Sequence, residues 1–85
     1  MVSIKYLAMT DEIMILDQKY NDEHGQHEVV VFELYENKIV SGKYRCLIDR
    51  KDNVILEWKE DKWYEGEKET ERANIVGKLI EEYEQ

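Results

Sequence analysis

The stretch that decides the fold is residues 27–60, HEVVVFELYENKIVSGKYRCLIDRKDNVILEWKE, which contains three β-rich runs separated by two short polar turns. In the first run, 27–36, β-branched and aromatic residues predominate, a composition that favours a pleated and largely buried surface. Successive side chains of a strand point to opposite faces, and both faces of this run carry apolar residues. We therefore place it in the middle of a sheet.

The second and third runs, about 38–50 and 54–59, alternate apolar residues on one face with mostly polar residues on the other, as half-buried strands do. By this alternation Tyr44, Cys46 and Trp58 point into the core. Gly42 inside the second run indicates a bulge or a close backbone approach. Because the turns are short, the runs should pair as antiparallel hairpins.

The segments before this stretch are less clearly patterned. Residues 3–9 alternate weakly and predict a first strand. For residues 11–24 the sequence leaves two structures open. Thr10 as an N-cap and Gly25 as a C-terminal cap indicate a helix, whereas four consecutive apolar residues at 13–16 and a following polar loop indicate a strand over about 12–20. We favour the strand.

After Glu60 the composition shifts toward helix-forming residues, and apolar residues recur at helical spacing over about 67–84. The predicted apolar stripe of this helix consists of Ala73, Val76, Ile80 and Tyr83. Gly77 lies beside Ala73, and two small residues one turn apart would allow the helix to approach the sheet closely. We predict an α+β fold, an antiparallel β-meander of four to five strands with one C-terminal amphipathic helix packed on one face.

The 85 residues are sufficient for a single small domain, 1–85. The sequence contains neither a long apolar segment nor a signal region, so we expect a soluble, cytoplasmic protein. The single cysteine, Cys46, should be a buried and unreactive thiol.

The sequence offers little that could carry chemistry. His24 and His27 are the only imidazoles, and beside a polar loop they predict a solvated turn and no metal site. Neither serine lies in a nucleophile motif, and the four glycines form no phosphate-binding loop. We therefore expect no enzyme activity and no cofactor.

The formal net charge of -8 disfavours contact with nucleic acid or anionic lipid and permits a basic partner. The most distinctive surface candidate is residues 57–71, EWKEDKWYEGEKETE, in which aromatic side chains alternate with carboxylates. The residues we select as partner-binding are Glu57, Glu60, Asp61, Trp63, Tyr64, Glu65 and Glu67. The alternative is that Trp63 and Tyr64 simply cover the end of the sheet.

These features predict a small, acidic, non-enzymatic domain that docks on a basic, nucleic-acid-binding surface of another protein. Inhibitors, antitoxins, immunity proteins and phage-encoded factors have this size and charge. The alternative is a structural or assembly subunit, possible as a homodimer, that self-associates through an edge strand or the helix face. Direct nucleic-acid binding is not expected, because the basic cluster of Lys43, Arg45, Arg50 and Lys51 is diluted by neighbouring carboxylates.

Overall fold

The computed structural model describes residues 10–85, so the predicted strand at 3–9 lies outside the described residues. In that range the chain forms five strands followed by one helix. Their bounds are β1 (Thr10–Asp22), β2 (Gly25–Glu36), β3 (Ile39–Ile48), β4 (Asp52–Lys59), β5 (Lys62–Glu65) and α2 (Glu71–Glu84).

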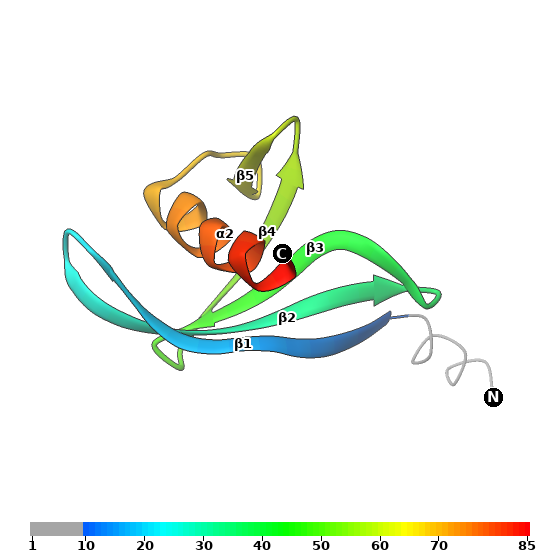
Figure 1. The fold of residues 1–85 in the computed structure, drawn as a ribbon, viewed down its shortest axis with the longest axis horizontal. Helices are drawn as coiled ribbons and strands as arrows, with labels where there is room; N and C mark the ends of the chain where they lie inside the picture. Colours follow the sequence, from blue (N-terminus) through cyan, green and yellow to red (C-terminus); the bar gives the residue numbers. More distant parts are fainter. Residues whose placement is uncertain (1–9) are drawn as a thin grey trace.

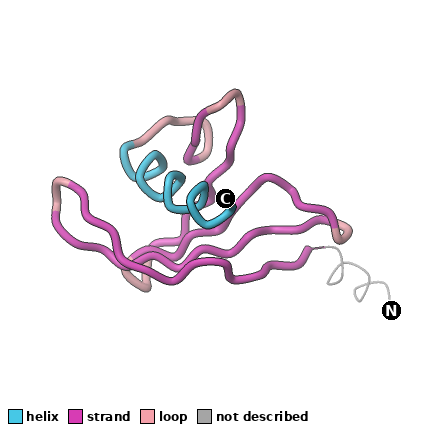
Figure 2. The backbone as a smooth tube through the Cα atoms, viewed as in Figure 1, coloured by secondary structure: helices cyan, strands magenta, loops and turns pink. Residues whose placement is uncertain are grey.

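The strands form one sheet in the order β1-β2-β3-β4-β5, and each neighbouring pair is antiparallel. This confirms the predicted α+β class with an antiparallel sheet and a C-terminal helix. Figure 1 shows α2 lying across one side of the sheet, with the β4–β5 hairpin rising beside it. Figure 2 shows how far the paired strands β1 and β2 extend beyond the helix. None of the helices in the described range is long and apolar enough to cross a membrane.

Strand β1 resolves the ambiguity of residues 11–24 in favour of a strand. Its pairing with β2 shifts register between Met14 and Leu16, so Ile15 is an extra, bulged residue. Ile15 and Leu16 both pack against the core, although they are adjacent in sequence. The bulge therefore explains why four apolar residues can follow one another in a strand that otherwise alternates.

A second irregularity confirms the expectation at Gly42. Register in the β2–β3 pair shifts between Glu33 and Tyr35, opposite the β3 segment that contains Gly42. Gly42 has φ +84°, a left-handed conformation that glycine adopts without steric cost. Gly42 lies near the C-terminal end of α2, because it lines a cavity together with Glu81 and Glu84. Figure 1 shows this end of α2 beside β3.

The core lies between the sheet and the helix. Fully buried side chains come from the sheet at Val29, Val31, Cys46 and Leu56, and from the helix at Ala73, Val76 and Ile80. Tyr83 was expected on the same stripe, but the structure leaves it 52% exposed. The helix also begins at Glu71 and not near 67, since the Thr70 side chain caps it by accepting a hydrogen bond from the Ala73 backbone N–H at 3.0 Å.

The prediction that Trp58 lies in the core is wrong. Trp58 and Trp63 are direct cross-strand partners and share one face, but Trp58 is 42% exposed while Trp63 is only 4% exposed. Trp63 is buried because its ring lies directly against Gly77 of α2. Alternation correctly assigns the face of Trp58, but the helix does not extend over that position. The close approach expected at Gly77 is thus a contact with one tryptophan ring.

Candidate functional site

A cavity of about 270 Å³ opens where the C-terminal end of α2 meets strands β3, β4 and β5. Three aromatic residues, Tyr44, Trp58 and Trp63, contribute to its lining. The Trp63 ring centroid lies 5.5 Å from that of Tyr44 and 5.3 Å from that of Trp58, each pair tilted by 58°. These tilted contacts fix the relative orientation of the rings. We call this feature the aromatic cavity.

Two carboxylates of the helix complete the aromatic cavity. The Trp63 indole N–H donates to Glu81 Oε2 at 2.6 Å, and the Tyr44 hydroxyl donates to Glu84 Oε2 at 2.9 Å. Burial, followed by the hydrogen bond to Glu84, raises the pKa of Tyr44 above its ordinary value. Tyr44 therefore remains a protonated donor, and both carboxylates are positioned by aromatic side chains of the sheet.

The end of α2 that carries these carboxylates is unfavourable for the helix itself. Glu81, Glu82 and Glu84 occupy its last turns, and the last turn contains no basic residue. Carboxylates at a helix C-terminus oppose the negative end of the helix dipole, and neighbouring like charges repel. The three glutamates consequently do not stabilise the helix terminus through charge.

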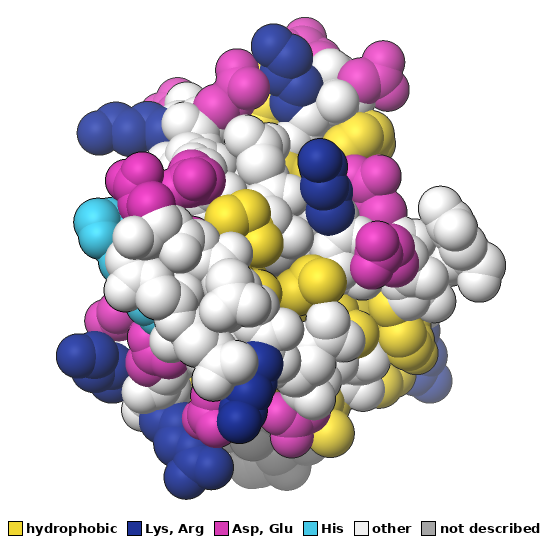
Figure 3. All heavy atoms as spheres, turned by 60° about the vertical axis from the view of Figure 1, so that its left-hand side comes forward, with side chains coloured by type: hydrophobic (Ala, Val, Ile, Leu, Met, Phe, Trp, Pro, Cys, Tyr) yellow, Lys and Arg dark blue, Asp and Glu magenta, His cyan; other side chains and the backbone are white. Residues whose placement is uncertain are grey.

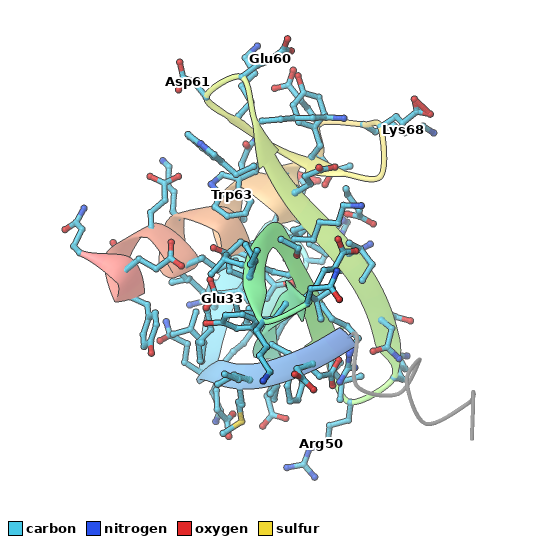
Figure 4. All side chains as sticks on the ribbon, turned by 90° about the vertical axis from the view of Figure 1, so that its right-hand side faces the viewer. Glu33, Arg50, Glu60, Asp61, Trp63 and Lys68 are labelled. Carbon is cyan, nitrogen blue, oxygen red and sulfur yellow. The ribbon has the colours of Figure 1, made fainter. Side chains whose placement is uncertain are left out.

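The partner-binding residues predicted from 57–71 separate in the structure. Glu60 and Asp61 form the exposed tip of the β4–β5 hairpin and point away from the rest of the molecule, whereas Trp63 faces the helix (Figure 4). Glu67 is exposed in the following loop, and Glu57 and Tyr64 are half-buried cross-strand partners.

Unlike the exposed Glu60, Asp61 and Glu67, Glu65 is engaged in contacts within the protein. Its carboxylate receives hydrogen bonds from Thr70 and from the guanidinium of Arg72, and the Arg72 contact is the main cause that lowers the pKa of Glu65. Glu65 and Arg72 are both partly buried. The pair therefore ties the end of β5 to the first turn of α2.

A second, polar cavity of about 380 Å³ lies at the opposite end of α2, beside the β1–β2 hairpin. Its lining includes His27, whose ring bridges two carboxylates, with Nδ1 2.7 Å from Asp49 Oδ2 and Nε2 3.1 Å from Asp22 Oδ1. The imidazole also stacks on the Tyr20 ring, with centroids 5.2 Å apart. The hydrogen bond to Asp49 is the largest cause that raises the pKa of His27. Desolvation lowers this pKa, but the hydrogen bond to Asp22 raises it further, and the net shift is upward.

The pKa values of the two carboxylates, Asp22 and Asp49, shift downward. Hydrogen bonds from His27 and from the Glu28 backbone N–H lower the pKa of Asp49. Desolvation raises the pKa of Asp22, but hydrogen bonds from the His24 backbone and the His27 ring outweigh it, so the net shift is downward. The arrangement stabilises an imidazolium that joins the β1–β2 hairpin to the β3–β4 turn.

In the polar cavity, both ring nitrogens of His27 already face carboxylates. As an imidazolium, His27 donates from both ring nitrogens to carboxylates and then has no lone pair for a metal ion. Across residues 10–85, no group of three or more His, Cys, Asp or Glu side chains is placed to hold one. Cys46 is buried, which raises the pKa of its thiol to about 12. In Figure 3, histidine side chains lie among acidic and basic side chains at the left edge of the face that is turned toward the viewer.

No protein-family model, curated protein or solved structure matched the chain. The site must therefore be judged by its own geometry. Sequence patterning did not select Tyr44 as a site residue because its spacing in β3 assigns it to the core, and the contact between Tyr44 and Glu84 spans 40 positions. The pairing of His27 with Asp49 likewise joins residues whose proximity only the strand register reveals.

Proposed function

We propose that this chain is a small acidic protein-binding domain, a β-meander with an amphipathic helix packed on one face, that docks on a basic surface of another protein. The observation that carries the proposal is an exposed Trp58 ring with carboxylates from two elements near it. Glu81 and Glu84 of α2 line the aromatic cavity together with this ring, and Glu60 and Asp61 form the exposed tip of the hairpin that carries Trp58. An exposed aromatic ring next to uncompensated carboxylates suits a positively charged partner.

The tip of the β4–β5 hairpin extends this surface. Glu60, Asp61 and Glu67 are exposed, and none of them takes part in an ion pair among residues 10–85. Their charge is thus available to a partner without breaking an internal contact. A protein with this surface would act by occupying a basic region that otherwise binds nucleic acid, as an inhibitor does.

Charge reversal tests the proposal. One variant carries Glu60→Lys, Asp61→Lys and Glu67→Lys, and a control carries the same charge change at Asp11, Asp17 and Glu36, which are exposed on β1 and at the end of β2. Each tagged protein is incubated with nuclease-treated lysate of cells that express it, at low and high salt, and retained proteins are quantified by mass spectrometry. We expect a basic protein that wild type and control retain at low salt and that the hairpin variant loses.

The proposal fails if the hairpin variant and the control retain the same proteins in the same amounts. Equal loss from both variants would also refute it, because only net charge and not a particular surface would then matter.

Self-association is a second candidate, favoured by a different surface. Strand β1, 13 residues long, is an edge of the described sheet and exposes Ile13 (53%) and Met14 (56%). Long edge strands with apolar side chains are templates for pairing with another copy. Sedimentation velocity over a hundredfold concentration range distinguishes the two: a dimer that persists at high salt supports assembly, and a monomer throughout excludes it.

A further inference from the structure

We propose that the aromatic cavity, lined by Tyr44, Trp58, Trp63, Glu81 and Glu84, binds the guanidinium group of an arginine side chain on the partner protein. This inference rests on the proposed function and specifies the chemistry of the contact. Its starting point is a preformed cavity whose walls are aromatic and whose charged lining consists of carboxylates alone.

The aromatic rings provide the surface against which a planar cation stacks. Trp58 is 42% exposed and is the most accessible of the three rings, while Trp63 and Tyr44 are buried. Tryptophan is the strongest of the aromatic side chains in cation–π contacts. Gly42 also lines the cavity, and nothing lies within 4 Å of the position that a Cβ would occupy there, so the backbone leaves the cavity open on that side.

The carboxylates supply acceptors that are already oriented. Trp63 and Tyr44 each occupy one oxygen, Oε2, of Glu81 and of Glu84 respectively, and within residues 10–85 the second oxygen of each accepts no hydrogen bond. A carboxylate offers about four lone-pair sites. An entering guanidinium, with five N–H donors in a planar fork, can therefore donate to both carboxylates while its face rests on Trp58.

The neighbouring cavity shows why the cation enters on this side of Trp63. That second cavity, about 420 Å³, shares Trp58, Trp63 and Glu81, but its charged lining also includes Asp61, Lys62 and Lys78, so two lysines offset its two carboxylates. Its lysines repel an incoming cation. Of these two cavities in the described part of the chain, only the aromatic cavity combines the rings with carboxylates that no lysine or arginine of the lining opposes.

The protein already holds one of its own arginines in this manner. The Arg45 guanidinium carbon lies 4.3 Å from the centroid of the Phe32 ring. The same group donates from Nε and Nη2 to the two oxygens of Glu12, at 2.9 and 2.7 Å. An aromatic face with a carboxylate at its edge is thus an arrangement in which this fold demonstrably accommodates a guanidinium.

The test uses three capped tripeptides, acetyl-Gly-Arg-Gly-amide, its lysine counterpart and its neutral citrulline counterpart. Both tryptophans of the chain line the cavity, so their two indole N–H resonances in a ¹⁵N-labelled sample report directly on it. For the arginine peptide we expect saturable shifts of both resonances with a Kd of about 1–10 mM. The lysine peptide should bind several-fold more weakly, and the citrulline peptide should not shift them.

Matched variants separate this cavity from general acidity. Glu81→Gln and Glu84→Gln keep an oxygen to accept from Trp63 and Tyr44 but remove the charge, and each should weaken binding about three- to fivefold. Glu82→Gln removes the same charge from the same helix at a residue that does not line the cavity, and it should bind like wild type. Trp58→Ala should lose binding while its other resonances remain dispersed as in the folded protein.

Two outcomes overturn the inference: absence of saturable indole shifts with the arginine peptide, or equal weakening by Glu82→Gln and Glu84→Gln. The proposed function fails separately. If lysate capture depends on the hairpin charges but the arginine peptide does not bind, docking stands and the arginine cavity is rejected. If the peptide binds as described but no captured protein depends on the hairpin charges, the cavity stands and the docking surface is rejected.

Discussion

Replacing Gly77 with alanine tests whether α2 packs on the sheet through a direct contact between Gly77 and the Trp63 ring. The new Cβ would lie 2.3 Å from Cγ, 2.4 Å from Cδ1 and 2.5 Å from Cδ2 of the Trp63 ring. Carbon atoms in contact ordinarily lie about 3.5–4.0 Å apart, so the ring or the helix must move by more than about 1 Å. The ring cannot move freely, because it is buried, hydrogen-bonded to Glu81 and packed between Tyr44 and Trp58.

Two opposing effects determine the magnitude. Alanine favours a helix interior over glycine by about 1 kcal/mol. Overpacking a well-filled core costs about 1–3 kcal/mol, and the upper end applies because a rigid indole must be displaced. The free energy of unfolding should therefore fall by about 2 kcal/mol. For a domain of this size that lowers Tm by about 8–16 °C.

Thermal and urea unfolding followed by circular dichroism measure the change. Asn74→Ala is the matched control, since Asn74 is exposed on the same helix and its replacement gains helix propensity without a new contact. A double-mutant cycle with Trp63→Leu should show strong coupling, because a smaller side chain makes room for the methyl group. If Gly77→Ala is as stable as wild type or more stable, the helix does not rest on Trp63, and the geometry assigned to the aromatic cavity is wrong.

His27→Gln should remove a pH dependence of stability. Because the pKa of His27 is raised in the folded protein, its contribution to folding stability is complete below the ordinary histidine value of 6.5 and is lost as the pH rises through the folded value. The pKa values of its partners Asp22 and Asp49 are lowered, so their contribution to folding stability is present above 3.8 and is lost in acid. The Tm difference between wild type and variant should thus be larger at pH 5.5 than at pH 8.5, and an equal difference at both would contradict the imidazolium bridge. Thr70→Ala removes the cap of α2 and should cost about 1 kcal/mol in urea unfolding, whereas Thr70→Ser should cost little; equal losses would show that the hydroxyl is not the capping group. The Cys46 thiol, with a pKa raised to about 12 by burial, should resist iodoacetamide at pH 8 in the native protein and react within minutes in denaturant, as followed by mass; rapid native labelling would show that the core opens there.

Strand alternation and helix periodicity predicted β2, β3 and β4, their antiparallel pairing and the C-terminal helix, and they favoured a strand at β1, but they did not predict the short strand β5 (Lys62–Glu65). They failed where a local feature interrupts the period. The bulge at Ile15 brings consecutive residues to the core, so residues 13–16 resemble neither a regular strand nor a helix face. The Thr70 cap shortens the helix although the helix-forming composition begins at Glu67.

The candidate site was less predictable than the fold. The segment 57–71 was selected for its composition, but the aromatic cavity combines Trp58 and Trp63 with Tyr44 and with carboxylates of α2. Alternation shows which face a side chain points to, and it does not show whether another element covers that face. The sequence therefore could not show that Trp63 is buried and Trp58 exposed, because this difference depends on the contact between Gly77 of α2 and the Trp63 ring.

The turn between β4 and β5 places Glu60 and Asp61 in a backbone conformation that favours glycine. Their φ angles are 55° and 66°, the left-handed region that costs an ordinary L-residue roughly 1 kcal/mol or more. The turn therefore costs the hairpin some folding stability, as do the turns at Asn37 and Lys38 and at Asp49 and Arg50, which have the same left-handed angles. A glycine at position 61 would make the hairpin more stable and its tip less acidic, so at this turn folding stability and negative charge are opposed.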